Sequence, residues 1–202
     1  MSDESARHFV HRLEAFSDIV IGFSLAQLGA SLIIPEHAIS LVQNPSWLFG
    51  FVLAFAVVCS MWFFHHRLFS RFFVPKPWPV ILNFIWLAVV VLLVYATQLY
   101  VRSMSDIIAV RMYFGAYTLA YGILGFQHLI AARIGPDPAG ARRGATFTFL
   151  WTTPFAVCLL ATALLPADIV NAITGLVFIA TTVAFMFLAR RRRRESTGSV
   201  SG

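Results

Sequence analysis

A charge-free stretch of the chain runs from Trp78 to Val101 and reads WPVILNFIWLAVVVLLVYATQLYV. A transmembrane helix needs about 20 predominantly apolar residues, so this stretch is long enough to cross a bilayer. The whole chain of 202 residues is 59% hydrophobic and 12% charged, whereas soluble domains average about 45–50% apolar and about 25% charged residues. The composition therefore argues strongly against a soluble enzyme, and the bilayer is the solvent that fits it.

Six apolar segments follow one another along the chain, separated by prolines and charged residues. We place them at residues 15–34, 46–70, 78–101, 107–132, 144–165 and 169–189. They are too long for strands, and none alternates as a membrane β-barrel strand does. We expect an all-α integral membrane protein with six transmembrane helices in a single domain over residues 1–195, followed by a disordered tail at 196–202. Pro154 lies inside the fifth segment and predicts a kink there.

The positively charged residues fall mostly on one side of the predicted helices. Thirteen cations share that side: Arg7, Arg12, Arg67, Arg71, Lys76, Arg133, Arg142, Arg143 and the run Arg190–Arg194. The other side has only Arg102 and Arg111. Because cytoplasmic loops are enriched in Lys and Arg, both termini are predicted to be cytoplasmic, in a multi-pass protein of the plasma (inner) membrane. We expect membrane lipids as partners of the arginine run and no nucleic acid, because the cations form no stripe with interleaved aromatics.

Few ionisable groups lie at membrane depth, and each is a candidate for function or for pairing. Glu14 and Asp18 lie one turn apart at the start of the first segment, and His65 and His66 end the second on the same side. A contact between the Asp18 region and the histidines would satisfy both sets of groups. Adjacent residues on a helix point about 100° apart, so the two histidines cannot bind one metal ion from one face. With no catalytic motif in the sequence either, we expect no catalysis, no metal and no cofactor.

The first segment differs from the others in its small and polar residues. Gly22, Ala26, Gly29 and Ala30 form a small-residue surface that allows another helix to approach closely. Phe23, Gln27 and Ala30 share one stripe of the helix. An unpaired amide near the bilayer midplane is costly. Gln27 therefore either bonds across a helix interface or belongs to a stripe that lines a water-filled path.

Several motifs in the first three segments resemble those of one family. Arg12-x-x-x-Phe16-Ser17-Asp18 opens the first segment, and Trp62-Phe63-Phe64-His65-His66-Arg67-Leu68-Phe69 ends the second. Asn83 lies near the start of the third segment. Together with the six-segment layout, these motifs resemble the transmembrane protein 175 family, which comprises potassium channels of endolysosomes with prokaryotic relatives.

The resemblance implies a homotetramer of six-helix units in which the first helix lines a central pore for K⁺ or other monovalent cations. The family constriction begins five residues after the motif's Asp, a position that Phe23 occupies here, with Gln27 and Ala30 as the next pore-facing residues. The resemblance also implies a structural network at the cytoplasmic side. Its members here are Arg12, Phe16, Ser17 and Asp18, with His65 or His66. The chain departs from the family where Phe23 and Gln27 replace aliphatic residues, where Ile19 replaces a Gly, and where Ala26 replaces a Thr.

Two other functions remain open on the residues alone. A proton-conducting protein or a proton-coupled carrier would use Asp18, His65 and His66 as a relay, because histidine changes charge between about pH 5 and 8. A structural or regulatory membrane protein would conduct nothing, with the constriction at Phe23 permanently closed. Saturable, pH-coupled flux would favour the carrier, and flux proportional to the gradient would favour a pore.

Overall fold

The computed structural model describes residues 3–30 and 46–198, and every regular element in these ranges is an α-helix. The helices are α1 Asp3–Ala30, α3 Ser46–Arg71, α4 Pro77–Arg102, α5 Ile107–Ile134, α6 Pro138–Ala161 and α7 Ala167–Gly198. The predicted all-α fold is therefore confirmed, with one helix for each of the six apolar segments.

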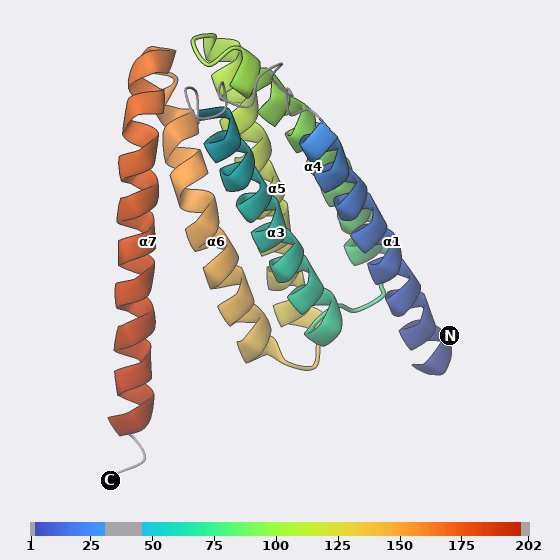
Figure 1. The fold of residues 1–202 in the computed structure, drawn as a ribbon. Coiled ribbons are helices and arrows are strands. Elements are labelled where there is room, and N and C mark those ends of the chain that lie inside the picture. The colour runs from blue at the N-terminus through green and yellow to red at the C-terminus, as the bar shows by residue number, and fades with distance from the viewer. Residues whose placement is uncertain (1–2, 31–45, 199–202) are drawn as a thin grey trace.

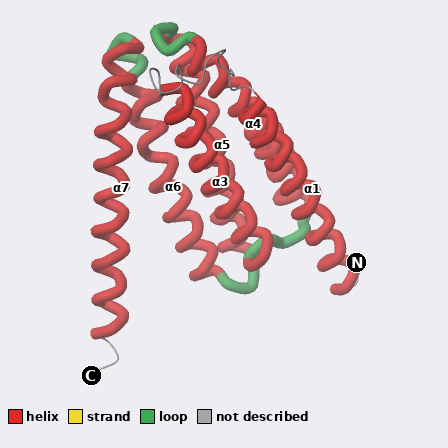
Figure 2. Tube along the Cα trace, in the orientation of Figure 1, coloured by secondary structure: helices red, strands yellow, loops and turns green. Residues whose placement is uncertain are grey.

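The helices run alternately up and down, and from α3 to α7 they are joined by short loops (Figures 1 and 2). α5 packs mainly against α4 and α6, while α1 lies on α3 and α4 at one edge and α7 lies on α6 at the other. The largest side chains of the core come from α4, α5 and α6, and they are Trp86, Phe114, Tyr117, Tyr121 and Phe155. Among the described residues, the pore-helix candidate α1 is thus attached to the bundle through the face that contacts α3 and α4.

Local sequence explains where several helices begin. Pro77 and Pro138 occupy the first turns of α4 and α6, where a missing backbone N–H costs nothing. The carboxylate of Asp106 accepts a hydrogen bond from Ile108 N at 2.8 Å, and that of Asp137 accepts one from Gly140 N at 2.8 Å. These N-caps satisfy backbone donors that have no partner inside the helix.

The observed helix ends differ from the predicted ones where polar residues continue an apolar segment. α1 already begins at Asp3, and α6 begins at Pro138, directly after its Asp137 cap. α7 continues past residue 189 to Gly198 and so includes residues 196–198 of the expected tail. Arg and Glu favour helices, so the charged end extends α7 without adding apolar surface. Predicted residues 31–34 of the first helix and 199–202 of the tail lie outside the described residues, and the kink at Pro154 stays a prediction.

Four helices are long and apolar enough to cross a membrane within the described ranges: Glu4–Ala30, Pro77–Arg102, Ile107–Ile134 and Pro138–Ala161. The apolar part of α7, Ala167–Thr181, is shorter. Large apolar side chains also cover the outside of the bundle, among them Tyr95, Leu119, Phe126, Leu160 and Leu176. Apolar surface of this extent is typical of contact with a membrane. That α3 and α7 also span remains a prediction from the sequence.

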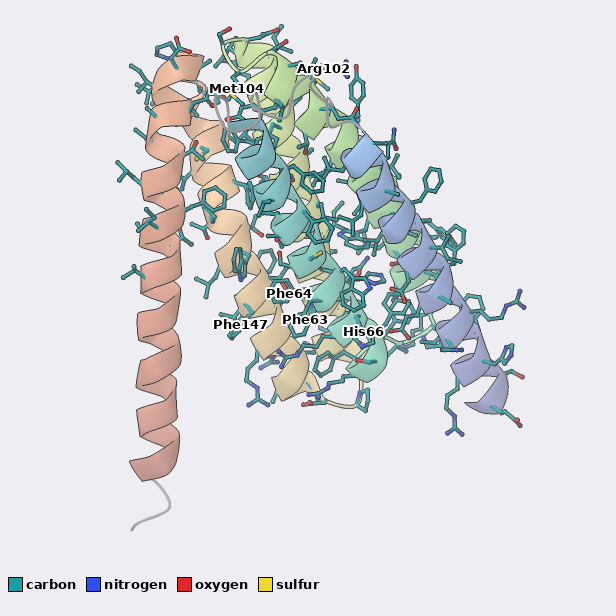
Figure 3. The ribbon with its side chains drawn as sticks, viewed as in Figure 1. Phe63, Phe64, His66, Arg102, Met104 and Phe147 are labelled. Carbon is teal, nitrogen blue, oxygen red and sulfur yellow. The ribbon has the colours of Figure 1, made fainter. Side chains whose placement is uncertain are left out.

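The two ends of the bundle differ in charge. The N-terminus of α1, the α3–α4 loop and the α5–α6 loop lie at one end, where α7 also ends (Figure 1). Figure 3 shows His66 toward this end and Arg102 and Met104 at the opposite one. The antiparallel alternation therefore gathers the arginine-rich segments at a single end, as the predicted topology requires.

Candidate functional site

The two faces of α1 have different surroundings. Its buried residues recur at spacings of three and four, namely Leu13, Ser17, Ile21, Ser24 and Leu28. On the other side Ile19 is 69% and Phe23 75% exposed, and Gln27 and Ala30 are exposed as well. The structure thus places the predicted stripe of Phe23, Gln27 and Ala30 on the outward face of the helix, exposed with respect to the other described residues.

Gln27 has no hydrogen-bond partner among residues 3–30 and 46–198. Its side chain is exposed and forms no hydrogen bond with any other described residue. Of the two interpretations that the sequence leaves open, a hydrogen bond between helices of one chain is therefore not found in the described ranges. A partner on a second copy, or water, fits an outward-facing amide.

A chain of hydrogen bonds attaches the inward face of α1 to α4 and α3. Ser17 Oγ donates to Leu13 O at 2.8 Å, so it accepts the bond from Asn83 Nδ2 at 3.1 Å. Asn83 Oδ1 lies 2.9 Å from His65 Nε2 and can only accept, so His65 donates from Nε2. Ser17, Asn83 and His65 are all fully buried. One amide therefore joins three helices inside the bundle.

His65 is held by rings as well as by Asn83. Its imidazole stacks on Trp86 with centroids 4.5 Å apart and on Phe69 at 4.4 Å. Trp86 Nε1 donates to Ala120 O at 3.0 Å, which ties the same cluster to α5. His65 Nδ1 has no hydrogen-bond partner in the described part of the chain. This histidine is enclosed by aromatic surface and is positioned to support α1 through Asn83.

A second, more exposed set of contacts joins α1 to α3. Trp62 Nε1 donates to Asp18 Oδ1 at 2.9 Å, and His66 Nδ1 lies 2.9 Å from Glu14 Oε1. The rings of Trp62 and His66 stack with centroids 5.6 Å apart. His66 and His65 therefore point to different helices and different partners. Among the described residues, no group of three or more His, Cys, Asp or Glu side chains is arranged to hold a metal ion.

The remaining motif residues lie outside this network. Phe16 packs edge-to-face against Phe84 of α4, with ring centroids 6.1 Å apart. Arg12 is exposed beside a hollow of about 820 Å³ and forms no hydrogen bond or ion pair with another described residue. The structure therefore brings Ser17, Asp18, His65 and His66 to the α1–α3–α4 contact, but not Arg12.

The contact expected between the Glu14–Asp18 region and the histidines is found at His66 and Glu14. The sequence places Asn83 only at the start of the third segment, and it does not predict the bond from Trp62 to Asp18. The signal for Asn83 was present, because an amide in a charge-free span of 24 residues is costly unless it is hydrogen-bonded. Its two partners, Ser17 and His65, lie on two other helices, so the pairing appears only in the folded chain.

Comparison with known protein families finds a match over the N-terminal part of the chain. Residues 12–93 match the family described as endosomal/lysosomal potassium channel TMEM175. The matched range begins at Arg12 and contains Ser17, His65 and Asn83. A comparison with curated proteins finds no match.

Two solved structures have a similar fold. The crystal structure of a lysosomal potassium-selective channel TMEM175 homolog from Chamaesiphon minutus aligns with a TM-score of 0.72 and 19% identity, over 88% of this chain and 98% of that one. The potassium channel MtTMEM175, crystallised as its T38A variant with a nanobody–MBP fusion, aligns with a TM-score of 0.55 and 16% identity, over 91% of this chain and 93% of that one. The two structures show a similar fold, and the family match over residues 12–93 confirms the predicted resemblance to TMEM175, a family of potassium channels rather than enzymes.

Proposed function

We propose that this protein is a cation channel, permeable to K⁺, in which α1 helices from four copies surround a central pore. The observation that carries the proposal is the division of α1 into two faces. The inward face is attached to α3 and α4 through Ser17 and Asn83, whereas Phe23 and Gln27 point away from the chain. Helices attached in this way can present their free faces to one another around an axis. The TMEM175 match supports K⁺ as the ion.

Phe23 forms the constriction of the proposed pore. Its ring is the most exposed large apolar side chain of α1. Four such rings around an axis would repel water, and a narrow apolar constriction closes a pore by dewetting. The stripe through Phe23, Gln27 and Ala30 has no charged residue. Passage therefore depends on the width at Phe23 and on the amide dipole of Gln27, and the electrochemical gradient drives the flow.

The arginine-rich end faces the cytoplasm in this proposal, with both termini inside and the protein in the plasma (inner) membrane. The gathering of cations at one end of the bundle supports this orientation, since cytoplasmic loops are enriched in Lys and Arg. Protease added outside sealed cells would then leave the C-terminal end intact.

Ion flux from purified full-length protein in liposomes tests the function. We expect K⁺ flux that rises with the gradient without saturating at low concentration, and no flux in protein-free liposomes. Saturable flux coupled to pH would instead establish a carrier that uses Asp18 and the histidines. Absence of K⁺, Na⁺ and H⁺ flux in protein whose mass is tetrameric would establish a non-conducting assembly.

Replacing Gln27 with Leu is expected to change the ratio of K⁺ to Na⁺ flux, because the amide oxygen that can face a partly dehydrated cation is removed. The exposed position predicts little effect on folding, within about 0.5 kcal/mol. Flux of both ions from liposomes measures the ratio. Gln98→Leu makes the same chemical change on α4, outside the proposed pore helix, and is expected to leave the ratio unchanged. An unchanged ratio in Gln27→Leu would assign this amide to contacts between helices.

A further inference from the structure

An apolar groove of about 700 Å³ runs along the outer surface of the bundle between α4 and α5. α5 supplies most of its wall, from Met112 to Phe126, and Thr118 is the polar side chain among the lining residues. At about 1.5 Å per residue, this part of α5 is about 21 Å long. The groove is therefore elongated along the axis of α5, and it lies between two of the helices that are long and apolar enough to cross a membrane.

Two glycines open the floor of the groove. Gly115 and Gly122 lie two turns apart on the same face of α5. A Cβ added at Gly122 would meet no atom within 4 Å, and one at Gly115 would only touch Leu159 at 3.9 Å. Leu92, Leu119 and Phe126 are about half exposed and form the rim. The space above Gly122 is thus left open by the fold.

A positive charge lies beside one end of the groove, next in sequence to the lining residue Met112. Arg111 precedes Met112 and lies one turn before Gly115, on the face of α5 that carries the groove. Its Nη2 donates to Thr162 O at 2.8 Å and its Nε to Thr162 Oγ1 at 3.3 Å, which fixes the guanidinium at the end of α6. These two bonds leave further N–H donors of an exposed guanidinium free to bind an anion.

We propose that this groove binds one phospholipid of the bilayer, with an acyl chain along Gly115 and Gly122 and the phosphate on Arg111. The hydrocarbon core is about 30 Å thick, so the chains of one leaflet cover about 15 Å. The groove exceeds that depth. Arg111 lies near the start of α5, and Figure 3 shows Arg102 and Met104, just before α5, at the end of the bundle opposite to His66, so Arg111 marks the headgroup level. An apolar groove with an arginine at one end has the charge and polarity of a phospholipid, which arginine recognises through its fork of donors.

Photo-crosslinking in the full-length protein tests the acyl-chain position. The probe is phosphatidylglycerol with a photoactivatable diazirine on its acyl chain, and the labelled residues are mapped by mass spectrometry. We expect labels to concentrate on groove residues such as Leu119 and Ile123. Gly122→Leu fills the open space and is expected to abolish them. Gly175→Leu on α7 also adds a side chain where a Cβ meets nothing within 4 Å, and it should leave them unchanged.

The headgroup position is tested by titrating unlabelled phosphatidylglycerol against the crosslink. In Arg111→Gln the concentration needed for half-competition is expected to rise about tenfold, the effect of losing a charge-assisted hydrogen bond. Arg102→Gln removes the other cation at that end of the bundle and should have no effect. Diacylglycerol lacks the phosphate. It should therefore reduce the crosslink at the same concentration in the original protein and in Arg111→Gln.

Two results would overturn the proposal. Labels spread evenly over the exposed faces of α4, α5 and α6, and unaffected by Gly122→Leu, would show ordinary bilayer contact only. The second result comes from Leu119→Cys in a chain with Cys59 and Cys158 replaced by Ala. If its new cysteine oxidises quantitatively to a disulfide-linked dimer, a second copy of the chain occupies the groove. Because neither measurement uses ion flux, both are independent of the channel proposal.

Discussion

Phe23→Ala is expected to raise K⁺ flux from liposomes by at least about tenfold, since a barrier lower by about 1.4 kcal/mol already changes a rate by that factor. The ring of Phe23 is 75% exposed, so its removal widens the proposed constriction without opening a cavity in the core. Stability should therefore stay within about 0.5 kcal/mol of the original protein. Initial rates of K⁺ efflux at equal protein content measure the effect.

The matched control is Phe63→Ala on α3, which removes another exposed phenylalanine ring (Figure 3). Phe63 lies on a different helix and is not part of the proposed pore. K⁺ flux through Phe63→Ala is therefore expected to equal that through the original protein. Equal flux from both variants would remove Phe23 from the constriction. A collapse of flux in Phe23→Ala with intact folding would likewise contradict the proposed gate.

Asn83→Leu is expected to have the largest effect on stability. The substitution leaves the buried donor His65 Nε2 without an acceptor and removes the bond to Ser17, and an unsatisfied buried group costs about 1–3 kcal/mol. Since the lost bonds join α1 to α3 and α4, the position of α1 should also change. We therefore expect a lower midpoint of thermal unfolding in detergent and altered K⁺ flux in the protein that remains folded.

Asn171→Leu provides the comparison for Asn83. Asn171 also makes two hydrogen bonds, accepting from Tyr100 Oη at 2.9 Å and donating to Met104 O at 2.8 Å, but neither involves α1. This variant should lose some stability and keep normal flux per folded protein. Normal stability and flux in Asn83→Leu would show that the buried amide does not hold α1.

The helical fold could be predicted from the sequence because a bilayer admits only α-helices and closed β-barrels, and the apolar segments are too long and do not alternate as barrel strands do. Prolines such as Pro77 and Pro138 then place helix starts within a few residues. The extension of α1 back to Asp3 could not be predicted in the same way, since its polar first turns bury little apolar surface. Helix ends of this kind depend on local propensity rather than on the membrane.

The contacts that attach α1 to α3 and α4 could be predicted in part. Ser17, Asp18 and the histidines were expected to meet, and the structure brings them to one contact between α1, α3 and α4. The bridging role of Asn83 required the third helix to be placed beside the first two. The proposed roles of Phe23 and Gln27 depend on contacts between copies. In a single chain, the two residues are visible only as part of the outward face of α1. That face is where an experiment decides between pore and lipid.

Thiol modification at position 23 tests most directly whether this face lines the ion path. In a chain with Cys59 and Cys158 replaced by Ala, Phe23→Cys is compared with Ile179→Cys, an exposed position on α7 at the opposite edge of the bundle. A membrane-impermeant cationic methanethiosulfonate reagent reaches a water-filled pore but not lipid. The account predicts that the reagent blocks K⁺ flux through Phe23→Cys and leaves Ile179→Cys unaffected. Undiminished flux through Phe23→Cys, with position 23 unmodified, would contradict it.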